Sequence, residues 1–237
     1  MLEPKSIEQI DDEFREACMK SNIEKIKLFI SHGVNINHKE IYCGNSPINI
    51  VCFTGNLEVF ELLLLNGANI NNRNLFQETT IIFESRNNKN IKIIELLILN
   101  GANIHDRDVD ENTPIIVASR YGKIDVVELL LLNGANIHDK NNDDESSIIV
   151  ASKQLYKCHI DVIKLLLSNG ADIYDKIKGE NTPLIQAIRY QHFNGIELLK
   201  RWPLTMLIIV LQELFVYHLI DFSSFIDFFE YCYEYCY

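Results

Sequence analysis

A glycine-terminated motif recurs along the chain at almost constant spacing, and this repetition constrains the fold more than any other feature. The clearest copy, VVELLLLNGANI, spans residues 126–137. The glycines that end the copies are Gly33, Gly67, Gly101, Gly134 and Gly170, separated by 34, 34, 33 and 36 residues. Such a period is typical of a solenoid, in which each repeat buries its apolar face only by stacking on its neighbours.

A second motif marks the other half of each unit. It reads Ser46-Pro47-Ile48, Thr113-Pro114-Ile115 and Thr182-Pro183-Leu184, with weaker versions at Thr80-Ile81-Ile82 and Ser146-Ser147-Ile148. We expect Thr113 to cap a helix that begins at Pro114, because proline at the first helical position loses no intrahelical hydrogen bond. Ala118, in register with Ala151 and Ala187, predicts close approach of this helix to its neighbour.

The apolar spacing before each glycine predicts a second helix. In the clearest copy, Ile124, Val127, Leu130 and Leu131 recur at helical spacing and are expected to form its buried stripe. Gly134 is expected to end this helix in a left-handed conformation, which satisfies the last carbonyl groups. An extended hairpin then leads to the next unit.

These two motifs, at a period near 33, resemble the ankyrin repeat over about residues 12 to 200. The resemblance implies an all-α ankyrin-repeat solenoid of stacked helix-turn-helix units with hairpin loops. The Asn-, Ile- and Lys-rich composition also resembles that of ankyrin proteins from mimivirus-type giant DNA viruses. The glycine that the family places in its hairpins survives only as Gly44. The matching positions, expected to be strained or differently turned, carry Glu78, Glu111, Asp144 and Glu180.

We predict seven segments along the chain. They are an N-terminal helix with a degenerate first repeat at 1–37, repeats at 38–71, 72–105 and 106–139, a repeat with a loop insertion near 154–158 at 140–175, a truncated repeat at 176–200, and a C-terminal two-helix cap at 201–237. The apolar tail suits a cap that covers the end of the solenoid. The alternative is a docking element for a ubiquitin ligase, because Trp202-Pro203-Leu204 followed by Ile209 and Leu211 faintly resembles the Pro-led box of viral adaptors.

Composition excludes several classes of partner. Lys and Arg number 22 against 33 Asp and Glu, which gives a formal net charge of -11, and no basic cluster opposes this field. We therefore expect no nucleic-acid partner. The longest apolar run, 206–211, lies in the segment 204–219, which is interrupted by polar residues and is too short to span a bilayer, so we expect no membrane association. The N-terminus has no signal-peptide pattern, and the six cysteines have no disulfide-framework spacing. An intracellular, cytoplasmic location is expected, in the host cell if the source is viral.

No catalytic pattern is found. The sequence has no glycine-rich phosphate loop, nucleophile elbow or triad signature, so we predict no catalytic, cofactor-binding or metal-binding residues and no cofactor. His105 and His138 share one register with Asn37, Asn71 and Tyr174, which indicates a polar hairpin position and not a metal ligand. The Asp- and Glu-rich segments 108–111 and 143–145 lack the spacing of a calcium loop and are expected to be hairpin tips that can attract a basic partner.

The resemblance implies a monomeric, non-enzymatic scaffold that binds another protein in a concave groove. In the family this groove is lined by the hairpin tips and by the exposed ends of the first helices. The matching residues predicted to bind the partner are Tyr42, Phe53, Phe76, Arg120, Tyr121, Lys153, Arg189 and Tyr190. Arg120-Tyr121 and Arg189-Tyr190 are the strongest candidates, because Tyr and Arg dominate interface hot spots.

Overall fold

The computed structural model describes residues 6–153, 157–172 and 175, and within these residues it contains ten α-helices and no β-strand. The helices are α1 (Ile7–Met19), α2 (Ile23–Ser31), α3 (Pro47–Thr54), α4 (Leu57–Leu65), α5 (Thr80–Asn87), α6 (Ile91–Leu99), α7 (Pro114–Arg120), α8 (Ile124–Leu132), α9 (Ser147–Ser152) and α10 (Lys157–Ser168). Consecutive helices form pairs, which we number as repeats one to five. The predicted all-helical solenoid is confirmed over this part of the chain.

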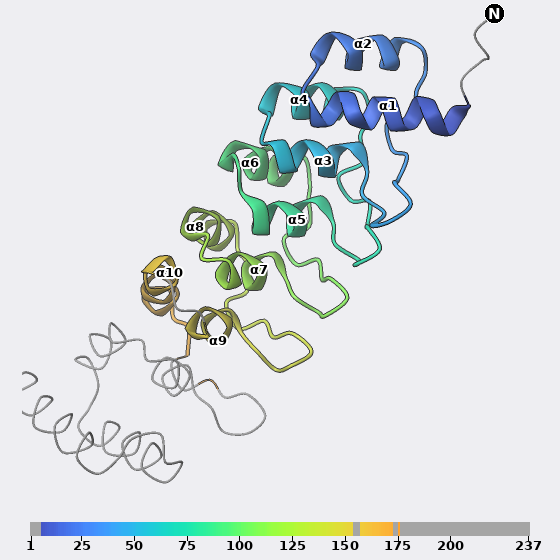
Figure 1. The fold of residues 1–237 in the computed structure, drawn as a ribbon. Helices are drawn as coiled ribbons and strands as arrows, with labels where there is room; N and C mark the ends of the chain where they lie inside the picture. Colours follow the sequence, from blue (N-terminus) through green and yellow to red (C-terminus); the bar gives the residue numbers. More distant parts are fainter. Residues whose placement is uncertain (1–5, 154–156, 173–174, 176–237) are drawn as a thin grey trace, which may run out of the picture.

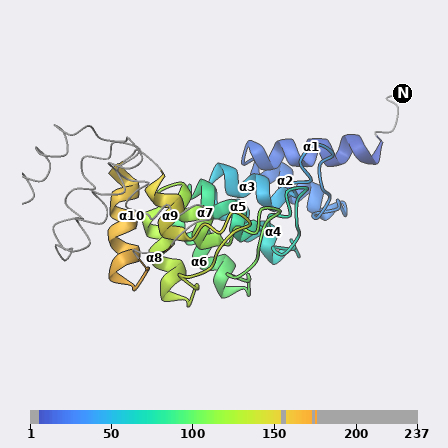
Figure 2. The ribbon, with the colours of Figure 1, turned by 90° about the horizontal axis from the view of Figure 1, so that it is seen from below.

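The helices form two layers with the hairpins on one side. The first helices of the repeats, α1, α3, α5, α7 and α9, stack on one another, and the second helices form the other layer (Figures 1 and 2). Hairpin loops project from the first-helix layer, away from the second helices (Figure 1). This arrangement leaves a surface between the hairpins and the first helices.

The core lies between the two layers, and the second helix of each repeat contributes a recurring set of buried positions to it. In α8 the buried residues are Val126, Val127 and Leu130, and the same three positions are buried in α4 and α6. The predicted stripe was therefore partly wrong. Ile124 is 37% exposed and Leu131 only partly buried, because the helix presents its Val126 face, and not its Ile124 face, to the first helices.

Both ends of the helices can be compared with the prediction. Gly134 has φ +90°, so the left-handed helix end is confirmed. The first helix begins at Pro114 as predicted, but the capping role of Thr113 was wrong. The Thr113 side chain makes no capping hydrogen bond. It is fully buried, so we attribute its position to packing between repeats.

The hairpins share one turn although only one of them contains glycine at the turn position. Gly44 has φ +72°, and Gln77, Glu111 and Asp144 take almost the same left-handed conformation, with φ between 59° and 61°. A left-handed conformation costs a residue with a side chain about 1–2 kcal/mol. The turn residue of repeat three is thus Gln77 and not Glu78. Helix α5 starts at Thr80 after its N-cap Thr79, so the predicted register of this repeat was one residue too late.

Some predictions fall outside the described residues. They concern part of the loop insertion (154–156), the truncated repeat, the cap and the docking segment, and the residues Glu180, Ala187, Arg189 and Tyr190. Among the helices that are described, none is long and apolar enough to cross a membrane.

Candidate protein-binding groove

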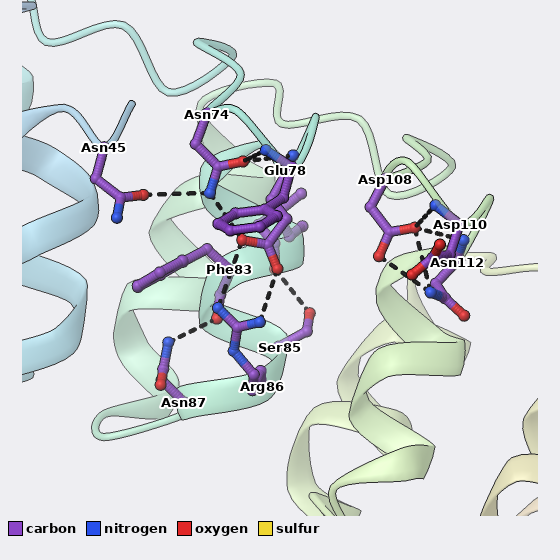
Figure 3. A network of polar contacts seen from close by, with 12 residues as sticks. Asn45, Asn74, Glu78, Phe83, Ser85, Arg86, Asn87, Asp108, Asp110 and Asn112 are labelled. Carbon is purple, nitrogen blue, oxygen red and sulfur yellow. Dashed lines mark hydrogen bonds and ion pairs between the residues drawn. The ribbon is translucent and has the colours of Figure 1, made fainter. Parts of the chain in front are cut away.

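Each hairpin is closed by a side chain that folds back on the loop. In repeat three the Asn74 Oδ1 atom accepts hydrogen bonds from the backbone amides of Phe76 and Glu78, both at 2.9 Å (Figure 3). Asp108 accepts in the same way from the amides of Asp110 and Asn112, at 2.9 and 2.8 Å. These bonds satisfy the loop amides internally, so the tip side chains are free to project.

Neighbouring hairpins are joined into one edge by backbone hydrogen bonds. The amide of Leu75 donates to the carbonyl of Cys43 at 2.9 Å, and the amide of Val109 donates to the carbonyl of Phe76 at 3.0 Å. The amide of Asn142 continues the series to the carbonyl of Asp110, also at 3.0 Å. Because these contacts fix the tips relative to one another, residues about 33 apart in sequence form a continuous surface.

The stems of the hairpins carry a ladder of basic residues, Lys39, Arg73, Arg107 and Lys140. Arg73 Nη1 donates to the carbonyl oxygens of Gln77 in its own hairpin and Arg107 in the next, both at 2.7 Å. Arg73 also pairs with Asp106, with Nη2 3.1 Å from Oδ1. Arg107 and Lys140 make corresponding ion pairs with an aspartate of the next repeat. These basic groups are therefore used to tie repeats together.

The first helices contribute a second series of basic residues to the groove, each eight positions after a hairpin residue. Arg86 forms two hydrogen bonds to the carboxylate of Glu78, at 2.8 and 3.4 Å (Figure 3). Arg120 Nη2 donates to Asn112 Oδ1 at 3.0 Å. Lys153 donates to Glu145, which also lies 3.6 Å from Arg120. Because Glu78 and Glu145 are both buried, these contacts offset the free-energy cost of removing their carboxylates from water.

A hollow of about 240 Å³ lies between repeats three and four, where the two hairpins meet the first helices. Its lining consists of Phe76, Glu78, Arg86, Asp108, Val109, Asp110, Asn112, Val117, Arg120 and Tyr121. Three of the predicted binding residues, Phe76, Arg120 and Tyr121, are therefore brought together here. Phe76 and Tyr121 are about half exposed, at 53% and 47%. We refer to this hollow as the inter-repeat pocket.

The other predicted residues do not line this pocket. We number each hairpin by the repeat into which it leads. Tyr42, at the tip of hairpin two, is 88% exposed, and Phe53, near the end of α3, is 59% exposed. Lys153 pairs with Glu145 and is not part of the pocket lining. All three lie on the hairpin and first-helix positions that were predicted, but they are separate from the pocket.

Arg86 lines the pocket and was missed by the sequence analysis. The one-residue error at Thr79-Thr80 moved the expected end of the first helix of repeat three one residue past its true position, so Arg86 was not matched to Arg120. The sequence does contain a pattern that predicts Arg86. Arg86 follows Glu78 by eight residues, as Arg120 follows Asn112 in the next repeat.

The groove offers little for covalent or metal chemistry. No group of three or more His, Cys, Asp or Glu residues could hold a metal ion within the described part of the chain. Cys18 and Cys52 are free thiols buried in the core, and burial raises the pKa of Cys18 to about 12, which disfavours its thiolate. Burial and the neighbouring Glu40 also raise the pKa of Cys43, the free thiol in the hairpin of repeat two. What the groove does provide is exposed aromatic area beside fixed charges, which suits recognition of another macromolecule.

Comparison with known families agrees with this architecture. Residues 14–64 match a family model described as ankyrin repeats (many copies), and residues 81–177 match a model described as ankyrin repeats (3 copies). The two matches together cover more than half of the chain. A comparison with curated proteins gave no match. From its repeated helix pairs, its stacked hairpins and these matches, we conclude that the chain belongs to the ankyrin-repeat family.

Proposed function

We propose that this chain is a non-enzymatic scaffold that binds another protein through the groove between the hairpin tips and the first helices. Ankyrin repeats are generally protein–protein interaction modules. The observation that carries the proposal is the row of exposed apolar residues along the tips of hairpins two to four: Ile41, Tyr42, Leu75, Phe76 and Val109. Large apolar side chains that converge on one exposed edge mark an interaction site.

The groove has the composition of an interface core. Aromatic residues and arginine are enriched where protein partners bury surface, and the inter-repeat pocket combines both. If the source is a giant virus, as the Asn-, Ile- and Lys-rich composition suggests, the partner is a host protein. The alternative role as a ubiquitin-ligase adaptor depends on residues 202–211, outside the described part, and stays a prediction from the sequence.

The proposal is tested by comparing two serine substitutions in the full-length, tagged chain. Phe76→Ser removes an exposed aromatic ring from the groove, whereas Leu99→Ser removes an equally apolar, 81% exposed side chain from the end of α6 in the second-helix layer. Captured proteins are quantified by mass spectrometry. We expect the wild type and Leu99→Ser to capture the same proteins and Phe76→Ser to lose them. Loss with Leu99→Ser alone would place the binding face on the second helices and contradict the proposal.

A further inference from the structure

We propose that the partner places a lysine or arginine side chain in the inter-repeat pocket, and that apolar residues of the partner lie beside this cation on the side facing repeat two. This inference rests on the proposed function and specifies its partner. The partner segment is thus apolar at one end and basic at the other. The two ends are recognised by different parts of the same hairpin edge.

The walls of the pocket suit a long side chain with an apolar stem. Phe76 and Val109 come from the hairpin tips, and Val117 and Tyr121 from α7 and its C-terminal end. Lysine and arginine bury their aliphatic stems against such surfaces while the charged group stays near water. The aromatic faces of Phe76 and Tyr121 add a cation–π attraction that a neutral or anionic side chain does not gain.

The arginines of the pocket are already paired with protein groups. Arg86 makes two hydrogen bonds to Glu78, and Arg120 contacts both Asn112 and Glu145. Arg86 is therefore neutralised by Glu78 before any partner arrives, whereas Arg120 shares Glu145 with Lys153, and the Arg120 Nε atom is buried away from solvent. An acidic side chain entering the pocket would gain little from them.

The remaining charge of the pocket is negative. Asp108 is held by the backbone amides of its hairpin and by the Asn112 side chain, at 3.1 and 3.2 Å. Asp110 differs, because it is exposed at the rim and its carboxylate has no ion-pair partner among the residues that the structure describes. A partner cation with its stem between Phe76 and Tyr121 would find this carboxylate at the mouth of the pocket. Asp110 is thus the group that selects a basic side chain.

The hairpin edge has a direction, which orients the partner. The exposed tips are apolar in repeats two and three, at Ile41, Tyr42, Leu75 and Phe76. Beyond Val109 they become polar, with Asp110, Asn142 and Asp143 all exposed. Because backbone hydrogen bonds join these hairpins into one edge, a bound segment that follows it meets apolar side chains first and carboxylates next. Complementarity then places the basic end of the segment toward repeat five.

The test uses a display library of random twelve-residue peptides, selected for binding to the full-length chain. Wild type is compared with Asp110→Lys and with Glu128→Lys, which makes a similar charge reversal at an exposed position of α8, in the opposite layer. We expect the selected peptides to combine apolar residues with a Lys or Arg. We also expect Asp110→Lys to weaken the best of them at least tenfold, with little change for Glu128→Lys. Asp110 is exposed, so the variant should fold, which circular dichroism verifies.

The outcomes separate this inference from the proposed function. Selected peptides that are acidic, or that bind Asp110→Lys as tightly as wild type, overturn the inference. If these acidic or Asp110-insensitive peptides still lose binding when Tyr42 or Phe53 is changed to serine, the groove binds proteins, but not by placing a cation in the inter-repeat pocket. If no selected peptide depends on any of these groove residues, both proposals are contradicted.

Discussion

Repeats three and four have nearly the same backbone but differ in how well their first helices suit it. Helix α7 begins with Pro114 and places the small Ala118 in the core, whereas α5 begins with Thr80 and places Glu84 at the position of Ala118. Their second helices are almost alike, with Ile93, Ile94 and Leu97 buried in α6 as Val126, Val127 and Leu130 are in α8. The difference shows that the second helices and their terminal glycines set the fold, and that the first helix can depart from the pattern at a cost in stability.

Glu84 is the clearest example of a residue that departs from the pattern and is expected to lower stability. It is fully buried, and neither carboxyl oxygen has a hydrogen-bond partner of normal geometry in the described part of the chain. Burial raises its pKa to about 8, although the backbone amides of Lys89 and Asn90 act in the opposite direction. Burial, together with this same carboxyl group, raises the pKa of the Cys52 thiol in α3.

The largest effect should come from the core leucines that the two repeats share. Leu97→Ala and Leu130→Ala each remove a fully buried side chain, so each should lower the free energy of unfolding by about 2–5 kcal/mol. Urea denaturation measures both. Leu132→Ala is the control, because Leu132 is 79% exposed and its removal should cost less than about 0.5 kcal/mol. A loss well below 1 kcal/mol for Leu130→Ala would place it outside the core.

The second prediction concerns the pH dependence of the free energy of unfolding, to which Glu84 of repeat three contributes and Ala118 of repeat four cannot. A carboxyl group with a raised pKa keeps its proton in the folded state while the unfolded state loses it. Wild type should therefore lose stability as pH rises from about 4.5 to 8, by at most about 1.4 kcal/mol per pH unit. Glu84→Gln cannot ionise and should lack this component. Urea denaturation of both proteins at pH 5 and pH 8 measures it, and identical pH dependence in the two would show that Glu84 is not buried as a carboxylic acid.

A third comparison concerns the arginines of the groove. Arg86→Ala leaves the buried Glu78 carboxylate with Asn74 as its remaining side-chain partner, so it should cost about 1–3 kcal/mol. Arg120→Ala leaves a neutral amide at Asn112 and a Glu145 that is still paired with Lys153, so it should cost less. Chemical denaturation of the two variants compares them. A larger loss for Arg120→Ala would contradict this assignment of the charge partners.

The smallest effect lies in the hairpin turns. Gln77→Gly and Glu111→Gly each relieve a left-handed conformation but increase the freedom of the unfolded chain, so each should stabilise the protein by roughly 0.5–1 kcal/mol. The reverse change, Gly44→Gln, should destabilise it, because a Cβ atom there would lie 3.0 Å from the backbone nitrogen of Leu75. Thermal melting of the three variants and the wild type measures these changes in stability. Destabilisation by both glycine variants would mean that these side chains hold the turn by contacts of their own.

The repeats could be located from the sequence wherever the residues of the glycine-terminated motif recur without change. Gly134 and its counterparts, and the leucines before them, recur so closely that the second helices follow directly. Sequence reasoning failed at Thr79-Thr80, where two threonines and no proline leave the helix start ambiguous by one residue. That error hid Arg86 and misplaced the strained turn residue. The role of Thr113 was also misjudged, because burial between repeats depends on neighbours that one repeat does not show.

The inter-repeat pocket could be anticipated only in part. Phe76, Arg120 and Tyr121 were predicted from their positions within single repeats. Phe76 of one hairpin lies beside α7 of the next repeat because a backbone hydrogen bond joins Val109 to Phe76. The spacing of residues in the sequence does not predict this contact between repeats. Sites formed between repeats are therefore harder to derive than the repeats themselves.

The central claim is that the hairpin edge, and not the second-helix layer, binds the partner. Hydrogen–deuterium exchange of the full-length chain, with and without the tightest-binding displayed peptide, tests it most directly. We predict slower exchange on binding at 75–77 and 109–111 and at the C-terminal ends of α5 and α7, with α6 and α8 unchanged. Slower exchange confined to α6 and α8 would contradict the claim.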